Sequence, residues 1–287
     1  MIKNFFNISD LNKNDFYEIL KLNSNNQNLS DKHIGLIFEK YSTRTRLSFN
    51  VAISSLGGKP IDIRFEELNF SRDESFEDTF KAMNCYLDGL IYRTSSHSNL
   101  INSSKYFEKP IINALSELSH PCQILSDIFT LQEHFKTLDL TILWTGDMNN
   151  VCFSLIEAAN LIEDLRLIIC SPKSISSQYD WFLKSNVKII DNLKSVDLKS
   201  VNCVMTDVFI SMNDKDSNEK LSILKDYSVN SELMSQTHPN SIFMHCLPAK
   251  VGLEVTEEVF RSSKSIVWKQ AYNRMLVQRN LLQYIYQ

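Results

Sequence analysis

The chain has 287 residues, of which 43% are hydrophobic and 22% charged, a composition typical of a globular protein with one large or two medium domains. A formal net charge of −4 argues against a broad nucleic-acid surface and against a polybasic membrane patch. The N-terminus lacks the apolar segment of a signal peptide, and no run approaches the length of a membrane span, so we expect a cytoplasmic protein.

The cysteines are widely scattered and include no CxxC pair. They lie at positions 85, 122, 152, 170, 203 and 246. This spacing is typical of neither a zinc site nor a disulfide scaffold, so we expect reduced thiols and no structural metal.

Strand and helix patterns alternate along the first half of the chain. The expected elements are a helix over 9–20, a strand over 34–38, a helix over 47–56, a strand over 60–63, a helix over 76–86, a strand over 88–93, a helix over 100–107, a strand over 110–114 and a helix over 124–135. This rhythm predicts a parallel sheet with helices on both faces.

The same rhythm restarts in the second half of the chain. The expected elements are a strand over 140–144, a helix over 151–161, strands over 165–170, 187–190 and 201–207, a helix over 231–235, a strand over 242–246 and a long helix over 271–286. We therefore predict two α/β domains of similar size, with a boundary near residues 134–139.

A polar turn follows the first expected strand and precedes a helix. It reads Ser42-Thr43-Arg44-Thr45-Arg46. Hydroxyls and backbone N–H groups at a helix N-terminus favour an anion, and the forked Arg44 guanidinium can hold two oxygens of a phosphate. The alternative is a solvated helix start that Ser42 caps, with the arginines as surface charge. The turn alone leaves both interpretations open.

Other polar groups follow later strands, where open α/β sheets bind ligands. They are Arg93, His120-Pro121-Cys122-Gln123, Gly146-Asp147-Met148-Asn149-Asn150, Asp207 with Ser211-Met212, and His245-Cys246-Leu247-Pro248. The glycine turn is not a dinucleotide fingerprint, because no GxGxxG is present. A catalytic His/Cys couple is disfavoured, because adjacent strand residues point to opposite faces.

Taken in order, these motifs resemble the aspartate/ornithine carbamoyltransferase family over nearly the whole chain. STRTR and HPxQ mark the family generally, whereas residues 243–249 (FMHCLPA) and Asp207 with Ser211-Met212 resemble its ornithine branch. The resemblance implies two doubly wound parallel-sheet domains with the active site in the cleft between them. Residues 1–135 would bind carbamoyl phosphate, 136–270 would bind ornithine, and the C-terminal helix, 271–287, would pack back on the first domain.

The resemblance also implies roles for individual residues around carbamoyl phosphate. Its phosphate would be bound by Ser42, Thr43, Arg44 and Thr45. Its carbonyl oxygen, where negative charge builds during attack, would accept from Thr45, Arg93 and His120. Gln123 would bind the carbamoyl NH2, Arg274 would return from the last helix, and Arg72 would reach in from a neighbouring subunit. These roles imply a homotrimer with sites at subunit interfaces.

In the second domain the resemblance implies an ornithine site. Asn150, Ser211 and Met212 would surround the α-carboxylate, Asp207 would pair with the α-ammonium, and Cys246 and Leu247 would lie near the δ-amine. The catalytic set would be Arg44, Thr45, Arg93, His120 and Cys246. No metal or organic cofactor is expected, because the departing phosphate can accept the proton of the amine. Catalysis would come from positioning and electrostatics.

Several positions depart from the family pattern. Asn50 and Tyr272 stand where glutamates are frequent, Val251 where an arginine is usual, and Asn213 where a glycine follows Ser-Met. Asp73 follows Arg72 in a loop that normally has glycines or lysines. Other acceptors therefore remain open, namely putrescine, an acylated ornithine or aspartate, as does a non-catalytic paralogue that only binds carbamoyl phosphate. Asp207 favours an acceptor with a free α-ammonium.

Overall fold

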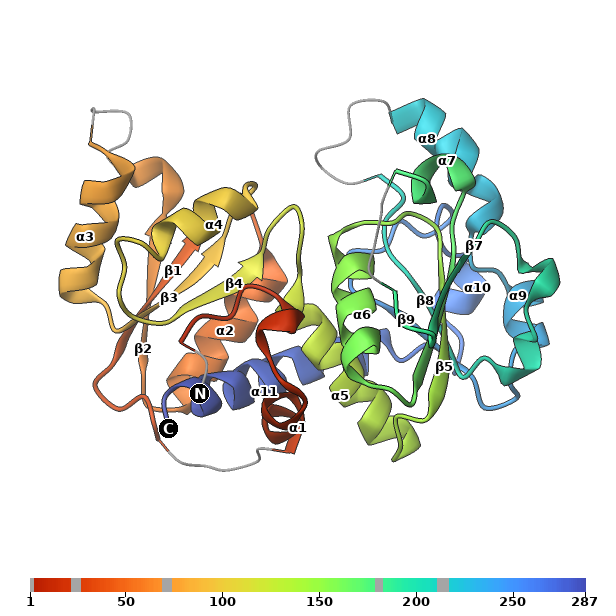
Figure 1. Cartoon of the computed structure of the whole chain (residues 1–287), viewed down its shortest axis with the longest axis horizontal. Helices are drawn as coiled ribbons and strands as arrows, with labels where there is room; N and C mark the ends of the chain where they lie inside the picture. The colour runs from red at the N-terminus through yellow and green to blue at the C-terminus, as the bar shows by residue number, and fades with distance from the viewer. Residues whose placement is uncertain (1–2, 22–26, 69–73, 179–182, 211–216) are drawn as a thin grey trace. The chain divides into compact units, whose positions relative to one another are not determined.

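The computed structural model describes residues 3–21, 27–68, 74–178, 183–210 and 217–287 (Figure 1). The chain folds as two compact units. Unit 1 comprises Met1–Phe129 with Tyr272–Gln287, and unit 2 comprises Thr130–Ala271. Both divisions fall inside continuous helices, α5 (Pro121–Phe135) and α11 (Val267–Ile285), so each of these helices contributes residues to both units.

Unit 1 is built on a four-stranded parallel sheet in the order β2-β1-β3-β4. The strands are β1 (His33–Phe38), β2 (Lys59–Arg64), β3 (Gly89–Arg93) and β4 (Ile111–Leu115). The helices are α1 (Lys13–Lys21), α2 (Thr43–Ser55), α3 (Phe76–Tyr86) and α4 (His97–Ser103), with short 3-10 turns at Ile8–Asp10 and Phe65–Glu67. Helices α3 and α4 share one hydrophobic cluster with strand residues Ile37 and Tyr92.

The C-terminal part of α11 packs in unit 1. Asn280 Nδ2 donates to the carbonyl of Ile19 in α1 at 3.1 Å, and Tyr286 Oη donates to the carbonyl of Asp88 at 2.9 Å. The predicted return of the last helix to the first domain is confirmed by these contacts.

Unit 2 contains a five-stranded parallel sheet in the order β7-β6-β5-β8-β9. The strands are β5 (Leu140–Thr145), β6 (Leu165–Cys170), β7 (Val187–Ile190), β8 (Cys203–Thr206) and β9 (Ile242–His245). The helices are α6 (Asn150–Leu161), α7 (Lys173–Ser176), α8 (Ser217–Leu224), α9 (Ser231–Gln236) and α10 (Glu257–Phe260), with 3-10 turns at Leu193–Ser195, Leu198–Ser200 and Lys225–Tyr227. The chain runs outward from β5 to β7 and then returns to β8 beside β5, a topological switch point of the kind at which open sheets bind ligands.

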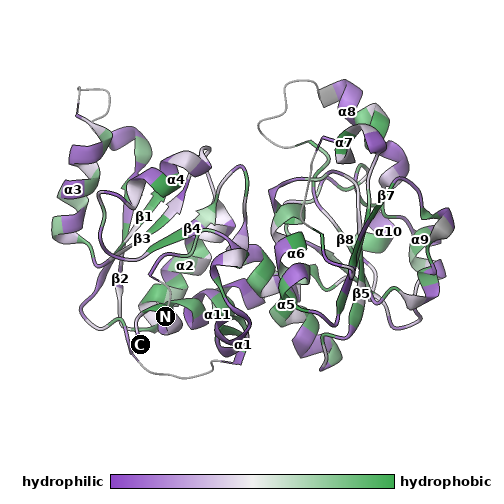
Figure 2. Ribbon diagram, in the orientation of Figure 1, coloured by the Kyte–Doolittle hydropathy of each residue, from purple (hydrophilic) through white to green (hydrophobic). Residues whose placement is uncertain are grey.

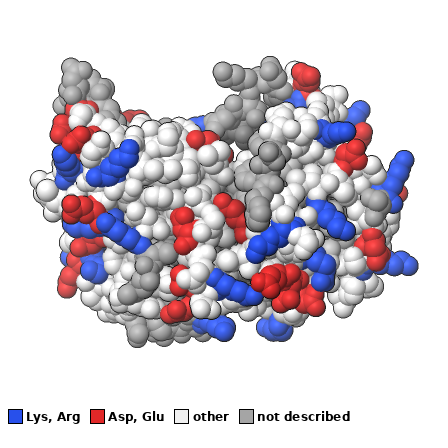
Figure 3. All heavy atoms as spheres, viewed as in Figure 1, with Lys and Arg blue, Asp and Glu red and all other residues white. Residues whose placement is uncertain are grey.

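Burial explains why these strands read as continuous apolar runs in the sequence. All six residues of β5 are buried, as expected for a central parallel strand covered on both faces. Figure 2 shows hydrophobic residues on strands such as β3, β4 and β5, whereas the edge strand β2 is more hydrophilic. Figure 3 shows basic and acidic side chains interspersed on the face in view. Within the described ranges, no helix is long and apolar enough to cross a membrane.

The predicted fold class, two α/β units with parallel sheets, is confirmed. Several predicted bounds are wrong. Helix α5 begins at Pro121 and not at 124, because a proline suits the first helical position, where its missing N–H costs nothing. Helix α4 covers His97–Ser103 and not 100–107, because Ser96 caps it by accepting from Asn99 N. Helix α11 begins at Val267, before the expected residue 271.

Candidate active site

The polar turn of unit 1 forms the first turn of α2. Ser42 occupies the N-cap position, but its side chain makes no capping hydrogen bond. Its Oγ instead accepts from Arg93 Nη1 at 3.1 Å. Because β1 and β3 are neighbours in the sheet, Arg93 at the end of β3 reaches the turn that follows β1. A simple capping role for Ser42 is therefore wrong, and the turn is linked to the strand end that the sequence singled out.

Thr45 and Arg274 form the second polar link at this turn. Thr45 is buried, and its Oγ1 accepts from Arg274 Nη2 at 2.9 Å. The two residues are 229 positions apart in the chain. Arg274 is itself only 4% exposed, and a buried guanidinium needs negative or polar partners. Two guanidinium groups therefore reach the start of α2, while Thr43 and Arg44 are exposed there.

His120 and Gln123 lie at the N-terminus of α5 and are buried. Burial lowers the pKa of His120 well below its usual value, and the positive charges of Arg274 and Arg93 lower this pKa further. His120 is therefore neutral at physiological pH and shares its surroundings with both arginines. Gln123 Nε2 donates to Asp127 Oδ1 at 2.8 Å, whereas Gln123 Oε1 finds no hydrogen-bond partner among the described residues. An acceptor is thus left available at the N-terminus of α5.

Glu39 is a supporting residue that the sequence analysis missed. Its carboxylate accepts from Tyr92 Oη at 2.6 Å and from the backbone N–H of Ser95 at 2.9 Å. Burial, and then the hydrogen bond to Glu39, raises the pKa of Tyr92, so this phenol keeps its proton. Glu39 therefore binds residues on both sides of Arg93 in the chain. A glutamate directly after β1 was the available signal, but no spacing rule connects it to residues more than 50 positions away.

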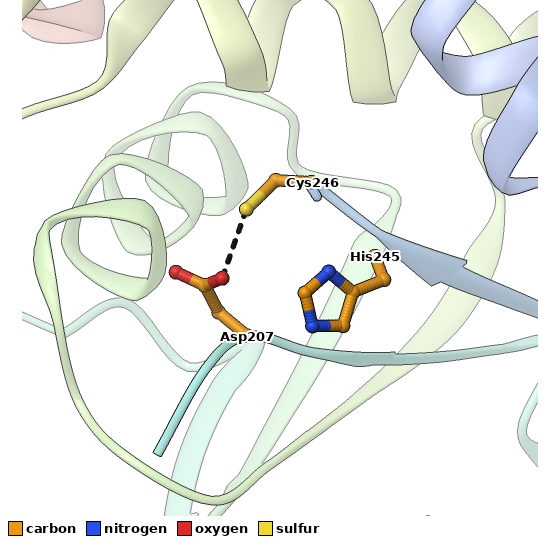
Figure 4. A group of neighbouring side chains, drawn as sticks. All are labelled: Asp207, His245 and Cys246. Carbon is orange, nitrogen blue, oxygen red and sulfur yellow. Dashed lines mark hydrogen bonds between the residues drawn. The ribbon is translucent and has the colours of Figure 1, made fainter. Parts of the chain in front are cut away.

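The candidate residues of unit 2 meet at the ends of β8 and β9 (Figure 4). Asp207 follows β8 and Cys246 follows β9, and these strands are parallel neighbours. Cys246 Sγ donates to Asp207 Oδ1 at 3.0 Å. Asp207 is 8% exposed, so its carboxylate is largely shielded from water, which strengthens its interaction with a cation. The predicted pair is thus brought together by the sheet.

Asn149 lies in the glycine turn that the sequence singled out, but it received no role there. Its Nδ2 donates to Asp207 Oδ2 at 2.7 Å, while its Oδ1 caps α6 by accepting from Val151 N and Cys152 N. The sequence analysis named Asn150, which is the first residue of α6. An N-cap asparagine before an apolar helix was the available signal, but a helix bound read from sequence is uncertain by one or two residues, so the signal does not separate the two neighbours.

The turn into α6 depends on a glycine. Gly146 follows β5 with a φ of +113°, which is unfavourable for other residues. A Cβ at this position would lie 2.6 Å from the Phe209 ring. Gly146 therefore lets the chain turn so that Asn149 reaches Asp207.

Asp207, His245 and Cys246 each offer a ligand atom, and these atoms lie within 4.8 Å of one another (Figure 4). Hydrogen bonds within the protein account for this arrangement. The thiol donates to Asp207, and His245 Nδ1 accepts from the backbone N–H of Leu247 at 2.9 Å. His245 Nδ1 is thus engaged with the backbone and not with the Cys246 thiol, so the arrangement does not form a nucleophile–base couple.

Three predicted site residues lie outside the described residues: Arg72, Ser211 and Met212. Their proposed roles rest on sequence alone. Leu247 is half-buried beside Cys246, and its backbone φ of +62° lies in the left-handed region.

Unit 1 therefore has an arginine-lined helix start that suits an anion, and unit 2 has a shielded carboxylate that suits a cation. The family models agree. "Aspartate/ornithine carbamoyltransferase, carbamoyl-P binding domain" matches residues 3–133, and "Aspartate/ornithine carbamoyltransferase, Asp/Orn binding domain" matches residues 138–285. The chain therefore belongs to the aspartate/ornithine carbamoyltransferase family.

Relatives extend the match over the full length. The ornithine carbamoyltransferase of Methanosphaera stadtmanae is 37% identical and covers 99% of both chains, and that of Methanosarcina acetivorans is 36% identical and covers 98% of both. The anabolic ornithine carbamoyltransferase of Campylobacter jejuni has a similar structure, with a TM-score of 0.89, 29% identity and 99% coverage of both chains. The enzyme from Thermus thermophilus has a TM-score of 0.88, 28% identity and 100% coverage of both.

Proposed function

We propose that this protein transfers the carbamoyl group from carbamoyl phosphate to the δ-amine of L-ornithine, giving L-citrulline and phosphate. The observation on which the proposal rests is the pair of contacts that Arg93 makes with Ser42 and Arg274 makes with Thr45. These contacts place two guanidinium groups at the start of α2, where the helix dipole also favours an anion. A solvated helix start that Ser42 merely capped would need neither guanidinium group.

In unit 1 the phosphate of carbamoyl phosphate would lie at the N-terminus of α2. Ser42, Thr43, Arg44 and Thr45 would bind its oxygens, and Arg274 would add positive charge. Arg44 is exposed, so its guanidinium is accessible to a ligand. A forked, charge-assisted contact with a phosphate is among the stronger polar interactions available to a protein.

The carbonyl group of carbamoyl phosphate would be polarised by Thr45, Arg93 and His120. Because burial and the two arginines keep His120 neutral, its imidazole would donate a hydrogen bond without adding a net charge. Gln123 Oε1, which lacks a partner among the described residues, would accept from the carbamoyl NH2. The three donors to the carbonyl oxygen would bind the transition state more tightly than the ground state, because negative charge develops on this oxygen.

In unit 2 the ornithine α-ammonium would pair with Asp207, which Asn149 orients. The δ-amine would lie near Cys246 and Leu247, and Asn150, Ser211 and Met212 would surround the α-carboxylate. Ornithine whose δ-ammonium has released one proton to solvent would attack the carbonyl carbon with the free amine. A C–N bond forms, the C–O bond to phosphate breaks, and the departing phosphate takes the electron pair and accepts the proton of the amine. The reaction balances without a metal or organic cofactor.

The proposal extends to assembly, location and pathway. A homotrimer in which Arg72 completes a neighbouring site is supported by apolar side chains that α2 leaves exposed, with Leu47 at 59% and Val51 at 50%. A cytoplasmic location is supported by the arrangement of the six cysteines, none of which is bonded to another in a disulfide. A biosynthetic role in arginine formation is supported by the likeness to the anabolic Campylobacter jejuni enzyme.

The test is a carbamoyl-transfer assay with the purified full-length protein. Ornithine, putrescine, acetylornithine and aspartate are offered in turn with carbamoyl phosphate. Citrulline should form with ornithine at the highest kcat/KM of the four. A folded protein that uses none of these amines would exclude the proposed enzyme.

A further inference from the structure

A buried histidine and a buried glutamate lie beneath the turn that bears Cys246. The side chains of His245 and Glu254 are both 0% exposed, and His245 Nε2 lies 3.3 Å from Glu254 Oε1. Neither His245 Nε2 nor Glu254 Oε2 has a well-aligned hydrogen bond among the described residues. Burying two such groups is costly and needs an explanation.

His245 supports the turn from its first residue. Its Nδ1 accepts from the backbone N–H of Leu247 at 2.9 Å, and its backbone N–H donates to Gln270 Oε1 at 3.0 Å. Because Nδ1 accepts, the ring proton of a neutral His245 lies on Nε2, the nitrogen that faces Glu254. The hydrogen bond from Leu247 N therefore sets the tautomer, and Glu254 Oε1 lies 3.3 Å from the nitrogen that carries the proton.

Glu254 supports the same turn from its far end. Its Oε1 accepts from the backbone N–H of Lys250 at 2.5 Å, and its own carbonyl accepts from Val229 N at 2.9 Å. A single carboxylate oxygen thus contacts His245 at the start of the turn and Lys250 at its end. The segment that bears Glu254 is itself tied to the core of unit 2, where Val229 and Val255 are fully buried.

The turn needs this support because of its backbone. Leu247 has a φ of +62°, in the left-handed region that a leucine rarely adopts. Cys246 lies immediately before it, and its thiol contacts Asp207 at 3.0 Å. If the hydrogen bond to Leu247 N were lost, the turn would relax toward a more favourable conformation and the thiol would move from Asp207.

We propose that Glu254 and His245 form a positioning pair that holds the turn bearing Cys246 and Leu247 and thereby sets the affinity for the amine acceptor. The inference rests on the proposed function, since Cys246 and Leu247 are assigned to the ornithine side of that site. Neither member of the pair is required to touch the substrate. Their effect passes through the Leu247 N–H.

The test compares Glu254→Ala and Glu254→Gln with Glu258→Gln, a matched control in which the exposed glutamate of the same segment changes. Two quantities are measured: the KM values for ornithine and carbamoyl phosphate, and the rate of Cys246 alkylation by iodoacetamide, located by peptide mass spectrometry. Glu254→Ala should raise the ornithine KM about tenfold or more while the carbamoyl phosphate KM changes less than about twofold. The Cys246 alkylation rate should change by about fivefold or more, because the contact with Asp207 is lost.

Glu254→Gln retains the acceptor for Lys250 N and for the ring N–H, so it should restore both quantities to near the values of the Glu258→Gln control. Equal KM changes for both substrates, or Cys246 alkylation at the control rate in Glu254→Ala, would overturn the positioning role. If Glu254→Ala does not fold, the His245→Asn variant tests the positioning pair in its place, because an asparagine can still accept from Leu247 N. The shorter asparagine gives up the contact with Glu254. A raised ornithine KM together with an altered alkylation rate in His245→Asn therefore supports the pair, and near-normal values of both refute it.

Failure of the proposed function is distinguishable from failure of this inference. A wild-type protein that forms no citrulline refutes the function, whereas the alkylation rates of the same variants still decide whether Glu254 positions Cys246.

Discussion

Arg44 is the residue that most directly separates an anion site from a solvated helix start. It is exposed, as a surface arginine would be, yet it lies in the first turn of α2 beside Ser42 and Thr45. Arg44→Ala should raise the carbamoyl phosphate KM and lower kcat, with a combined loss of about 2–4 kcal/mol in transition-state stabilisation. Steady-state kinetics measures this loss.

Arg64→Ala is the control for Arg44→Ala. Arg64 is another exposed arginine of unit 1, 72% exposed and paired with Glu67 on the surface. Its removal should change kcat/KM by less than about 0.5 kcal/mol. Equal effects of the two substitutions would mean that Arg44 is surface charge.

The buried His120 should make the stability of the fold depend on pH. Burial lowers its pKa well below 6.5, so the unfolded chain binds the proton first as the pH falls. The stability contributed by the neutral form is complete above pH 6.5 and is lost as the pH falls through the pKa of the folded state. The urea midpoint should therefore decrease between about pH 7 and pH 5, with a shallower decrease in His120→Gln. Identical slopes would contradict a buried neutral His120.

At the scale of the helix, Asn149 has two functions that a pair of variants can separate. It caps α6 and it donates to Asp207. Asn149→Ala should lower the free energy of unfolding by about 1 kcal/mol and also raise the ornithine KM. Asn230 caps α9 through Leu233 N, so Asn230→Ala is the matched control. It should cost similar stability and leave the ornithine KM unchanged. An equal KM in both variants would refute the orienting role of Asn149.

The nine strands and most of the helices that the structure describes were predictable because each has a local pattern, whereas α7, α8 and α10 were not predicted. β5 is uniformly apolar, and α5 follows a proline that suits its first position. The choice between Asn149 and Asn150 was not predictable, because it depends on a cap bound that sequence fixes only to within one or two residues. Glu39 and Glu254 were missed for a different reason. Folding brings these glutamates close to their partners, and no periodicity or spacing in the sequence predicts the contacts.

At the scale of the whole molecule, the proposed homotrimer predicts a particle of three 33.2 kDa chains. Leu47 and Val51 on α2 are exposed in the single chain and would be buried between copies. Sedimentation equilibrium should therefore give three times the chain mass, and Leu47→Asp should dissociate the particle and lower its activity, because a desolvated carboxylate opposes association. A fully active wild-type monomer would refute the shared site.

The proposed transfer from carbamoyl phosphate to the δ-amine of ornithine is tested by a comparison of four amine acceptors. Rates of product formation are measured with ornithine, putrescine, acetylornithine and aspartate at equal carbamoyl phosphate concentration. Because Asp207 would be left without its ammonium partner by putrescine, kcat/KM for ornithine should exceed that for putrescine by at least about a hundredfold. Turnover of another amine at a rate equal to or above that of ornithine, or turnover of none, would contradict the account.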